Sequence, residues 1–558
     1  MSEATVHPVR EPSSGAVAGA GVGVRLAELV AALSLATDLG LGQPQQHIIR
    51  QTLIAMRVAE RRQFTDEERA AIFYVSLLAW VGCVADAHEM GKWFGDDMAV
   101  RADSYLVDMT GLPMMRFMLG HIASGSSPIR RLTMIGKFLA GGSKEVQASM
   151  ASHCEASGDL SLRLGLGPDV REPLQQAFER WDGKGSPAQL AGNEIARIMR
   201  VVHVANDVEP LHRLGGVGAA VEMLRSRRGT EFDPELVDDF CANAVELLDS
   251  LDEIDGWDTL IGGHATLGRE LTSEELDRAL EAFADYADIK SPFTLGHSRG
   301  VALLASGAAT RVGLPAEDVV LVRRAALVHD VGKIGVSAGI LDKPGQLTGS
   351  ERERLHTHPY LTARVFSKPA ALGAIGQLAA LHHERMDGSG YPSGLTARSL
   401  PMTARILAAA DEYHSLLEPR PHRAALTCEA ARQALTLEVT DGRLDGDAVR
   451  AVLDAAGHRL RRRSDHPGGL TSREVEVLVL LARAQSKQQI AASLGIATKT
   501  VNAHVEHIYG KLGVTSRGAA ALFAMRHGLM SVDAVADETE DRAKTRRTRT
   551  LRSRTTAV

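Results

Sequence analysis

The feature that most constrains this chain is an internal duplication. The segment ERMDGSGYPSGL (384–395) has a counterpart in ERWDGKGSPAQL (179–190), 205 residues earlier. The same offset pairs Asp411 with Asn206 and aligns RILAAAD with RVVHVAN. A single distant match of this quality predicts two copies of one fold and not a solenoid of short repeats.

Farther upstream the offset between the copies grows to 250. It pairs His297 with His47, and HDVGK (329–333) with AWVGC (79–83). The difference between the two offsets (250 − 205) places about 45 extra residues in the middle of the first copy.

Both copies have a helical pattern. Apolar residues recur at spacings of three and four, as in RLAELVAALSLA and SEELDRALEAFADYA, whereas alternating strand patterns are scarce. Hydrophobic residues make up 44% of the 558 residues and charged residues 24%, which is an ordinary globular balance. We therefore expect an all-α fold with two tandem helical domains and a smaller third domain.

Composition excludes several classes of protein. The net charge of −6 rules out a chain-wide basic character, so nucleic-acid binding must be confined to a local patch. The four cysteines form no CxxC pair, which argues against a disulfide scaffold or a zinc knuckle. Because no apolar run approaches ~18 residues and the N-terminus does not resemble a signal peptide, we expect a cytoplasmic protein without a membrane span.

Changes in composition along the chain suggest its domain boundaries. Residues 461–469 are polar and contain Gly and Pro, as linkers do, and the C-terminal residues are basic and poor in apolar side chains. We expect a disordered leader (1–24), a first helical domain (25–262), a second helical domain (263–460), a linker (461–469), a compact helical domain (470–530) and a disordered basic tail (531–558).

The second copy concentrates histidine and aspartate. Eight of the 21 histidines lie between residues 297 and 422, and two adjacent pairs, His329-Asp330 and His382-His383, each follow an apolar helical run. Imidazoles and carboxylates at the inner ends of buried helices are costly unless they are paired. A bound divalent cation is the economical explanation, because this mixture of ligands suits Fe, Mn, Zn or Ni.

These motifs resemble the HD-GYP subgroup of the HD-domain metal-dependent phosphohydrolases. HDVGK and HHE-x-x-DGSGYP are both intact, and five separated motifs occur in the family's order over about 270–460. The resemblance implies an all-helical fold and hydrolysis of cyclic di-GMP at a di- or trinuclear metal centre. The metal ligands that it implies are His297, His329, Asp330, His358, His382, His383 and Asp411.

The resemblance also assigns roles to individual residues. Asp330 is the expected bridge between metals, and His358, which precedes a proline, matches the family ligand better than His356. Two metals ~3.5–4 Å apart activate water and orient a phosphodiester. Lys333 lies about one helical turn after Asp330, so it could meet the substrate phosphate, and its alternative is a solvated surface lysine. Asp330 and Lys333 are thus the predicted catalytic residues.

Further substrate contacts are expected from the glycine-rich loop and from two arginines. Gly390, Tyr391 and Pro392 suit a tight loop beside the metals. Tyr391 could stack on a guanine, contact a partner or only pack the loop. Arg420 and Arg423 match family positions near the dinucleotide phosphates, and they could equally be solvated.

The number of metals is expected to be two. Family members with a third metal carry a glutamate four residues before the first ligand histidine, but Phe293 occupies that position here. This departure favours a dinuclear site, with Fe or Mn as the metals.

The first copy should be degenerate. His47 survives, but the HD pair has become Ala79-Trp80, the HH pair has become Ala177-Phe178, and Asn206 replaces the last aspartate. One histidine and one amide cannot hold a cation, so we expect no metal there. A packing scaffold, a dimerisation platform and a sensor pocket remain as its possible roles.

The third domain shows the pattern of a helix–turn–helix. Two capping boxes, Thr471-x-x-Glu474 and Ser486-x-x-Gln489, begin helices, and a further helix follows Thr498. Its apolar stripe is formed by Val501, Val505, Ile508 and Leu512. The opposite face should enter the major groove of DNA.

This stretch resembles the LuxR-type (NarL/FixJ-like) DNA-binding domain, in LTSREVEVL, TVNAH and KLGV above all. The resemblance favours Lys499, Thr500, Asn502 and Lys511 as DNA contacts, with the lysines on phosphate and Asn502 at a base edge. The basic tail either adds sequence-independent attraction to phosphate or serves as a solubilising end.

Together these resemblances imply a transcriptional regulator that couples a cyclic-di-GMP-type phosphodiesterase to DNA binding, with a homodimer expected. Two alternatives stay open. The second copy could bind a nucleotide or metal as a sensor without turning it over, or it could hydrolyse another nucleotide.

Overall fold

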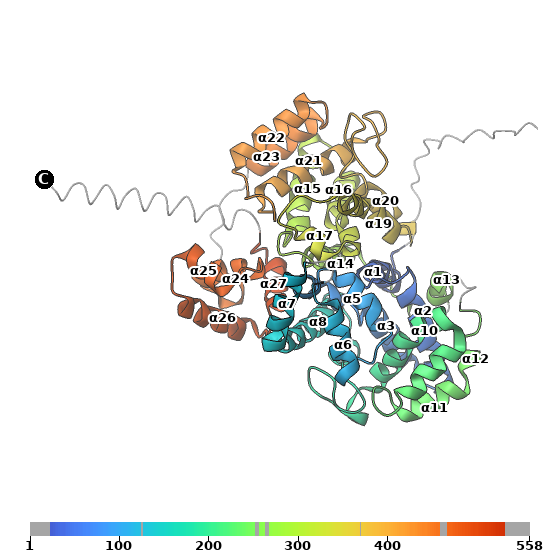
Figure 1. The fold of residues 1–558 in the computed structure, drawn as a ribbon. Helices are drawn as coiled ribbons and strands as arrows, with labels where there is room; N and C mark the ends of the chain where they lie inside the picture. The colour runs from blue at the N-terminus through green and yellow to red at the C-terminus, as the bar shows by residue number, and fades with distance from the viewer. Residues whose placement is uncertain are drawn as a thin grey trace, which may run out of the picture.

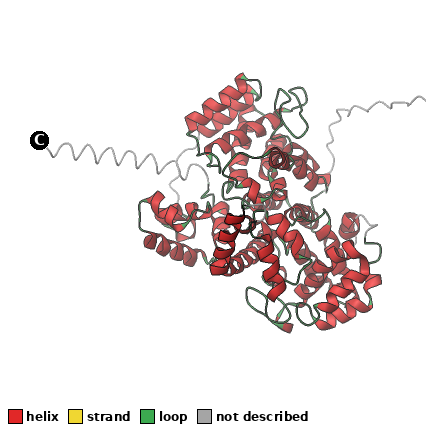
Figure 2. Cartoon of the chain, in the orientation of Figure 1, coloured by secondary structure: helices red, strands yellow, loops and turns green. Residues whose placement is uncertain are grey.

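The structure is a computed structural model that describes residues 23–123, 127–251, 256–262, 267–368, 370–457 and 466–530. Within these ranges the chain is helical, with isolated bridges and no strand (Figure 2). The prediction of an all-α fold is confirmed. The predicted leader and basic tail, and most of the predicted linker, lie outside the described residues; only 23–24 and 466–469 of these segments are described.

The first copy spans helices α1 to α13 (Figure 1). Their bounds are α1 (Leu26–Gly40), α2 (His47–Arg61), α3 (Asp66–Leu78), η1 (Val81–Val84), α4 (Ala87–Phe94), α5 (Asp97–Ser104), α6 (Gly111–His121), α7 (Pro128–Lys137), η2 (Phe138–Gly142), α8 (Ser143–Arg163), α9 (Pro168–Leu174), η3 (Gly192–Glu194), α10 (Arg197–Ser226), α11 (Pro234–Ala242), α12 (Ala244–Leu247) and α13 (Gly256–Gly262).

The second copy and the third domain follow. The second copy consists of α14 (Ser273–Asp288), α15 (His297–Val312), α16 (Ala316–Val328), η5 (Val331–Gly335), α17 (Ala338–Leu341), α18 (Gly349–His356), α19 (His358–Val365), α20 (Ala370–Ala379), α21 (Met402–Leu417), α22 (Cys428–Thr440) and α23 (Gly446–Gly457). The third domain consists of η6 (Pro467–Gly469), α24 (Ser472–Ala482), α25 (Lys487–Leu494), α26 (Thr498–Leu512) and α27 (Arg517–Arg526).

Local sequence sets several helix starts. Thr272 begins α14 with a capping box, in which its Oγ1 accepts from the Glu275 amide at 3.2 Å and its own amide donates to Glu275 Oε2 at 2.9 Å. The two capping boxes predicted in the third domain are present at α24 and α25. No single described helix is long and apolar enough to cross a membrane, although the bent pair Asp66–Val84 and Ala87–Phe94 meets that test jointly.

The two copies use equivalent elements in the same order. Gly82 of η1 lies against the backbone carbonyl of His153 in α8, and Gly332 of η5 lies against that of His358 in α19. Neither glycine leaves space for a Cβ atom, so α8 and α19 are equivalent. Helices α4 to α7 stand between η1 and α8, whereas the second copy has only α17 and α18 at that place. This is the extra segment that the change of offset predicts.

The extra segment of the first copy forms buried hydrogen bonds with the second copy. Asp97, at the start of α5, is fully buried, and its Oδ1 accepts from the Ser337 hydroxyl at 3.0 Å and the Ala338 amide at 2.8 Å. Its Oδ2 pairs with Arg101 at 2.9 Å and lies 3.7 Å from Nζ of the buried Lys290. Because Ser337 lies four residues after Lys333, this contact fixes the loop that leaves the HDVGK motif.

The third domain packs on the first copy through α27, which contacts α8 and α14 (Figure 1). Ser516 Oγ donates to Glu155 Oε2 at 2.9 Å, and Arg526 Nη1 pairs with Asp159 at 2.9 Å. Beyond α27, Met530 lies directly against Gly296, the residue before His297. The DNA-binding unit therefore touches both copies.

Asp97→Ala tests the buried contact between the two copies. It leaves Arg101 and Lys290 as buried charges with one partner fewer, so we expect the free energy of unfolding to fall by about 3–5 kcal/mol. Chemical denaturation followed by circular dichroism measures this. Asp96→Ser is the matched control, because Asp96 caps α5 through the amides of Met98 and Ala99 and serine retains that cap. An equal loss of stability in both variants would contradict the account.

Candidate metal centre and nucleic-acid interface

Five helical segments bring the predicted ligands of the second copy together. His297 is the first residue of α15, His329 and Asp330 join α16 to η5, and His358 begins α19. His382 and His383 follow α20, and Asp411 lies within α21. Of these seven side chains, all but His383 are buried, and His383 is partly buried.

The first group of ligands is formed by His297, His329, Asp330 and Asp411. His297 Nε2 lies 3.0 Å from Asp411 Oδ1 and 3.7 Å from Asp330 Oδ2. His329 Nε2 lies 3.5 Å from Asp330 Oδ2 and 3.7 Å from Asp411 Oδ1. Two imidazoles and two carboxylates thus turn their donor atoms toward one point.

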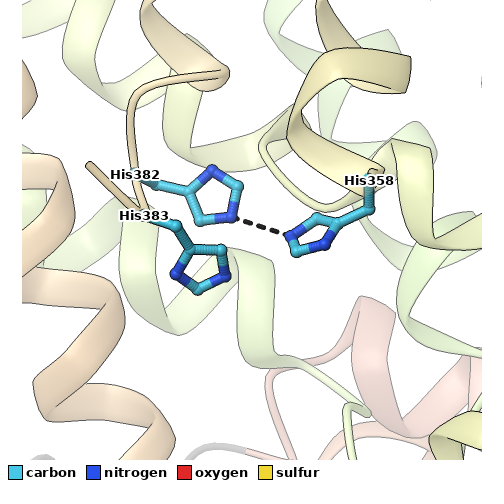
Figure 3. Close-up of side chains that lie close together, drawn as sticks. All are labelled: His358, His382 and His383. Carbon is cyan, nitrogen blue, oxygen red and sulfur yellow. Dashed lines mark hydrogen bonds between the residues drawn. The ribbon is translucent and has the colours of Figure 1, made fainter. Parts of the chain in front are cut away.

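The second group is formed by His358, His382 and His383 (Figure 3). His358 Nε2 lies 3.0 Å from His382 Nε2, and one ligand atom from each of the three residues lies within 4.8 Å of the others. Three neutral imidazoles packed this closely have little to bond to except a shared cation.

Asp330 lies between the two groups. Its Oδ2 faces the first group, while its Oδ1 lies 3.5 Å from His358 Nε2 and 3.7 Å from His382 Nε2. Asp330 Oδ1 and His329 Nε2 are buried and have no hydrogen-bond partner among the described residues. Buried polar atoms without partners are costly, and a metal ion on each side of Asp330 would satisfy them.

Backbone carbonyls orient the histidines. The Nδ1 atoms of His329, His358 and His382 lie 2.7, 2.6 and 2.7 Å from the carbonyls of Ala326, Leu355 and Ala379, respectively. Each Nδ1 is therefore the protonated nitrogen, and each Nε2 is left to face the site. This is the arrangement expected of imidazoles that bind a metal through Nε2.

The protonation states of three ligand histidines also suit a metal, whereas His297 differs. Burial lowers the pKa of His297, but the carboxylates of Glu418 and Asp411 outweigh burial and raise it to about 10, so a cation there would have to displace a proton. Burial lowers the pKa of His382 to about 4 and the pKa of His358 and His383 well below the usual range, so these imidazoles are neutral. Burial opposes the ionisation of both carboxyls, but His329 and Lys333 hold the pKa of Asp330, and the hydrogen bond with His297 holds the pKa of Asp411, well below its ordinary value. Neutral imidazole and ionised carboxylate are the forms that bind cations.

Two supporting residues were missed by the sequence reasoning. Glu418 is buried, and its Oε2 accepts from His297 Nδ1 at 2.9 Å, while its Oε1 lies 3.3 Å from His414 Nδ1. A carboxylate behind a ligand histidine fixes the orientation of the ring and raises its basicity. His414 and Glu418 lie three and seven residues after Asp411, about one and two helical turns, and this spacing was the available signal.

Lys333 and the glycine-rich loop lie beside the centre. Lys333 Nζ pairs with Asp330 Oδ2 at 2.5 Å, so it is not a freely solvated lysine. Tyr391 stacks on His356 at 3.9 Å between ring centroids and lies 4.7 Å from His383. His356 is therefore a neighbour of Tyr391, whereas His358 belongs to the ligand cluster.

A further buried acid, also missed by the sequence reasoning, holds the loop. Glu384 accepts from the amides of Ser393 and Leu395 at 2.7 and 2.8 Å. Gly390 lies directly against the backbone of residues 383–385, where a Cβ atom would not fit. The loop carrying Gly390, Tyr391 and exposed Pro392 is thereby fixed to the segment that supplies His382 and His383.

The two predicted phosphate arginines are both bonded within the protein. Arg420 Nη2 pairs with Glu418 Oε2 at 2.9 Å, and its Nη1 donates to the Phe293 carbonyl at 3.2 Å. Arg423 donates to the carbonyls of Ser415 at 2.6 Å and Leu416 at 3.1 Å. Both are partly buried, so neither is the freely solvated arginine that was the alternative.

The first copy contains a second surviving histidine, so the expectation that His47 alone persists was wrong. His153 occupies the place of His358, 205 residues later, and the inserted helices hid this match. Its ring contacts Trp80 and Phe178, with centroids at 6.1 and 4.7 Å, and its Nε2 lies close to the Ala79 carbonyl. Aromatic volume fills the former site, as the substitutions predicted.

The third domain presents its predicted recognition helix to solvent. In α26, Val501, Val505 and Ile508 are buried, whereas Lys499 and Thr500 are exposed. Ala497 caps this helix, which begins at Thr498 itself, one residue earlier than predicted. Figure 1 shows α26 on the side of the domain away from the second copy.

Asn502 and Lys511 are less free than predicted. Asn502 is half-buried, and its Oδ1 has no hydrogen-bond partner among the described residues. Lys511 Nζ pairs with Glu474 Oε2 at 2.6 Å and donates to the Gly469 carbonyl at 3.1 Å. Lys511 therefore stabilises the start of α24, and a phosphate contact would have to compete with Glu474.

Glu418→Gln tests the support of His297. The amide keeps the shape of the side chain but removes the charge that orients the imidazole, so metal affinity should fall by about 10- to 100-fold. Isothermal titration with Mn²⁺ measures this, with Glu429→Gln as an exposed control on α22. Unchanged affinity in Glu418→Gln would contradict the role.

Lys499→Ala and Lys511→Ala should have different effects. Lys499→Ala should weaken DNA binding and lower the salt slope of log K by about 1, because one phosphate contact is lost. Lys511→Ala should mainly lower the melting temperature of the third domain.

The pH dependence of the Lys511–Glu474 ion pair follows from the pKa of Glu474. Burial opposes its ionisation, but Lys511 and Thr471 lower its pKa to about 2, below its ordinary 4.5. The ion pair therefore stabilises above pH 4.5 and is lost as the pH falls toward 2. A melting difference between wild type and Lys511→Ala that persists at pH 2 would contradict this assignment.

Comparisons with known proteins agree with both resemblances. Residues 143–236 and 281–448 match the family model described as HD domain, and residues 469–524 match the one described as bacterial regulatory proteins, luxR family. The chain is 28% identical over 410 residues to 3′3′-cGAMP-specific phosphodiesterase 3 of Vibrio cholerae, covering 73% of this chain and 89% of that protein.

Two further matches are with a relative and with a solved structure. The cyclic di-GMP phosphodiesterase response regulator RpfG of Xanthomonas campestris is 42% identical over 125 residues, which are 22% of this chain and 33% of that protein. The crystal structure of a cyclic GMP-AMP-specific phosphodiesterase from V. cholerae matches with a TM-score of 0.54 at 25% identity, covering 78% of this chain and 99% of that chain. The chain thus carries segments that match the HD domain (143–236 and 281–448), followed by a segment that matches the luxR family of bacterial regulatory proteins (469–524).

Proposed function

We propose that this protein is a transcriptional regulator whose second copy hydrolyses a cyclic dinucleotide in a metal-dependent reaction. The observation that carries the proposal is the Asp330 carboxylate, which lies between two groups of histidines with one oxygen facing each group. The fused third domain supports a role in DNA binding.

The donor set favours two metal ions per chain. One would be held by His297, His329, Asp330 and Asp411, and the other by His358, His382, His383 and Asp330. When bound, such ions supply a nucleophilic water and stabilise charge on the phosphodiester. Fe and Mn are our candidates, because mixed imidazole and carboxylate sites suit these metals.

A third metal is not part of the proposal, although His297, His414 and Glu418 also lie close together. Glu418 Oε2 already accepts from His297 Nδ1 at 2.9 Å, so this cluster is a hydrogen-bonded support of a ligand. Phe293 supplies no ligand atom where a third site would need one.

The residues of the chain would orient the substrate. Lys333, one turn from Asp330, carries the positive charge that a phosphate oxygen would meet, and it would exchange its ion pair for the substrate. Tyr391 offers a stacked aromatic surface next to His383 for a base. Arg420 and Arg423 act as positioning residues in the proposal, since both are bonded to the segment around Glu418.

The nucleotide is the finer part of the proposal. The motifs favour cyclic di-GMP, and RpfG, which is 42% identical to this chain over 125 residues, carries that activity in its name. The relative that matches over both copies is named for 3′3′-cGAMP, so this mixed dinucleotide is the second candidate. Both are purine dinucleotides with 3′–5′ diester links, and one assay distinguishes them.

Dimerisation remains part of the proposal because a DNA-binding domain with few fixed charges gains affinity from a second copy. The rival function is a sensor that binds the nucleotide and never turns it over. The complete ligand set favours the enzyme, since a sensor has no need of two metal groups.

The test is hydrolysis by the full chain loaded with Mn²⁺ or Fe²⁺. Cyclic di-GMP, 3′3′-cGAMP, cyclic di-AMP and a panel of other nucleotides are supplied separately, chromatography follows the hydrolysis product, and equilibrium dialysis measures binding. Asp330→Ala should lower kcat/KM by at least about 1,000-fold, because it removes the shared ligand and several kcal/mol of charge stabilisation. Glu317→Gln, at an exposed acid on α16, the helix that ends just before His329, is the matched control and should act as wild type.

The outcomes separate the alternatives. Metal-dependent product from one of the three dinucleotides supports the proposal and identifies the substrate. Binding without product from any nucleotide would leave the sensor, and product from a different nucleotide class would show another phosphohydrolase.

A further inference from the structure

A cavity of about 420 Å³ lies where the first copy, the second copy and the third domain meet. The end of α8 (162–165) forms one wall, α14 forms another, and Arg526 of α27 reaches in from the DNA-binding domain. Small-molecule sites have volumes of ~300–1,000 Å³ and favour such junctions. None of the candidate metal ligands lines this cavity, so it is separate from the metal centre.

The cavity is rich in guanidinium groups. Five arginines line it, against two glutamates, Glu275 and Glu281. The arginines are Arg163, Arg269, Arg278, Arg299 and Arg526. They come from all three units and from the segment that joins the copies, so positive charge faces the cavity from several directions.

Two of these arginines each share a carboxylate with another arginine. Arg163 of the first copy and Arg299 of the second copy both pair with Asp285, at 2.8 and 2.6 Å, and Asp285 is fully buried. Arg299 and Arg323 also share Glu281, at 2.8 and 2.6 Å. These carboxylates fix the guanidinium groups in place. The Nε, Nη1 and Nη2 atoms of Arg299 all donate to Asp285 or Glu281, so donors for a ligand come from the other arginines.

Three further arginines line the cavity. Arg278 is exposed and has no acidic partner among the described residues. Arg526 is 40% exposed and pairs at 2.9 Å with Asp159 of α8. Arg269 pairs with Glu275 at 2.7 Å. Arg278 thus keeps donors that no carboxylate of the described residues uses.

The remaining lining is apolar. Leu26, Leu162, Leu164 and Leu271 contribute to the walls. Guanidinium groups match the oxygens of a phosphate in pairs, and leucines beside them suit a flat, weakly polar group. This combination fits a mononucleotide better than an inorganic anion.

We propose that this cavity is a second binding site, for a phosphorylated small molecule of the nucleotide class. A ligand there would contact the α8 end, α14 and Arg526 together. It would therefore favour the arrangement in which α27 is packed on α8, and a change in its concentration would alter the freedom of the DNA-binding domain. The proposal does not depend on phosphodiesterase activity.

The experiment measures binding of GMP to the full chain in EDTA, so that the metal centre takes no part. Isothermal titration compares GMP with guanosine and with pyrophosphate. We expect GMP to bind more tightly than guanosine, and we expect Arg278→Gln and Arg526→Gln each to weaken GMP binding at least tenfold. Arg311→Gln is the control, because Arg311 is exposed on α15, bonds to its own helix and does not line the cavity.

Hydrogen exchange gives the second readout. GMP should slow amide exchange in residues 515–530 of the wild type, where α27 packs on α8, and it should not do so in Arg278→Gln. Pyrophosphate binding as tight as GMP would assign the site to phosphate alone and overturn the nucleotide class. Failure of both GMP and pyrophosphate to bind, or equal binding by all variants, would overturn the site, whatever the activity assay shows.

Discussion

The shared carboxylate of Asp330 is the interaction on which the rest of this structure depends. It lies at the end of α16, fully surrounded by protein, with one oxygen toward His329 and the other toward His358. An ionised carboxylate in such a place is costly without positive partners. The fold provides them by directing four helix ends at one point. Backbone carbonyls fix the imidazoles of His329, His358 and His382, and Glu418 fixes that of His297. The chemistry that we propose follows from this geometry.

The degenerate first copy contacts the segment that follows Asp330 in the second copy. Its extra segment places Asp97 against Ser337 and Ala338, directly after the HDVGK motif. Its own former site is closed by Trp80 and Phe178 around His153. Duplication therefore left one copy with the ligands and the other with an interface, to which the DNA-binding unit adds its contacts through α27. This arrangement favours the packing role among those open for the first copy, whose contacts with the second copy include the buried charges of Asp97 and Asp285.

Much of the fold and of the candidate site was predictable from the sequence, because the motifs place ligand residues at fixed spacings along helices. The helical periodicity gave the all-α class, and HDVGK with HHE-x-x-DGSGYP gave the ligand set that the structure brings together. Residues whose role depends on tertiary packing were missed. Glu418 acts through His297, 121 residues away, and Asp97 acts across the two copies. His153 was hidden because the inserted helices broke the alignment. Lys511 looked like a free cation since no local pattern announces its pairing with Glu474.

The central claim is that Asp330 is shared by two metal ions in the second copy. Electron paramagnetic resonance of the full chain loaded with Mn²⁺ tests it most directly. Two ions that share a carboxylate should give the spectrum of an exchange-coupled pair, and Asp330→Ala should convert this to the signal of isolated ions. A wild-type spectrum of isolated Mn²⁺ ions at full loading would contradict the account.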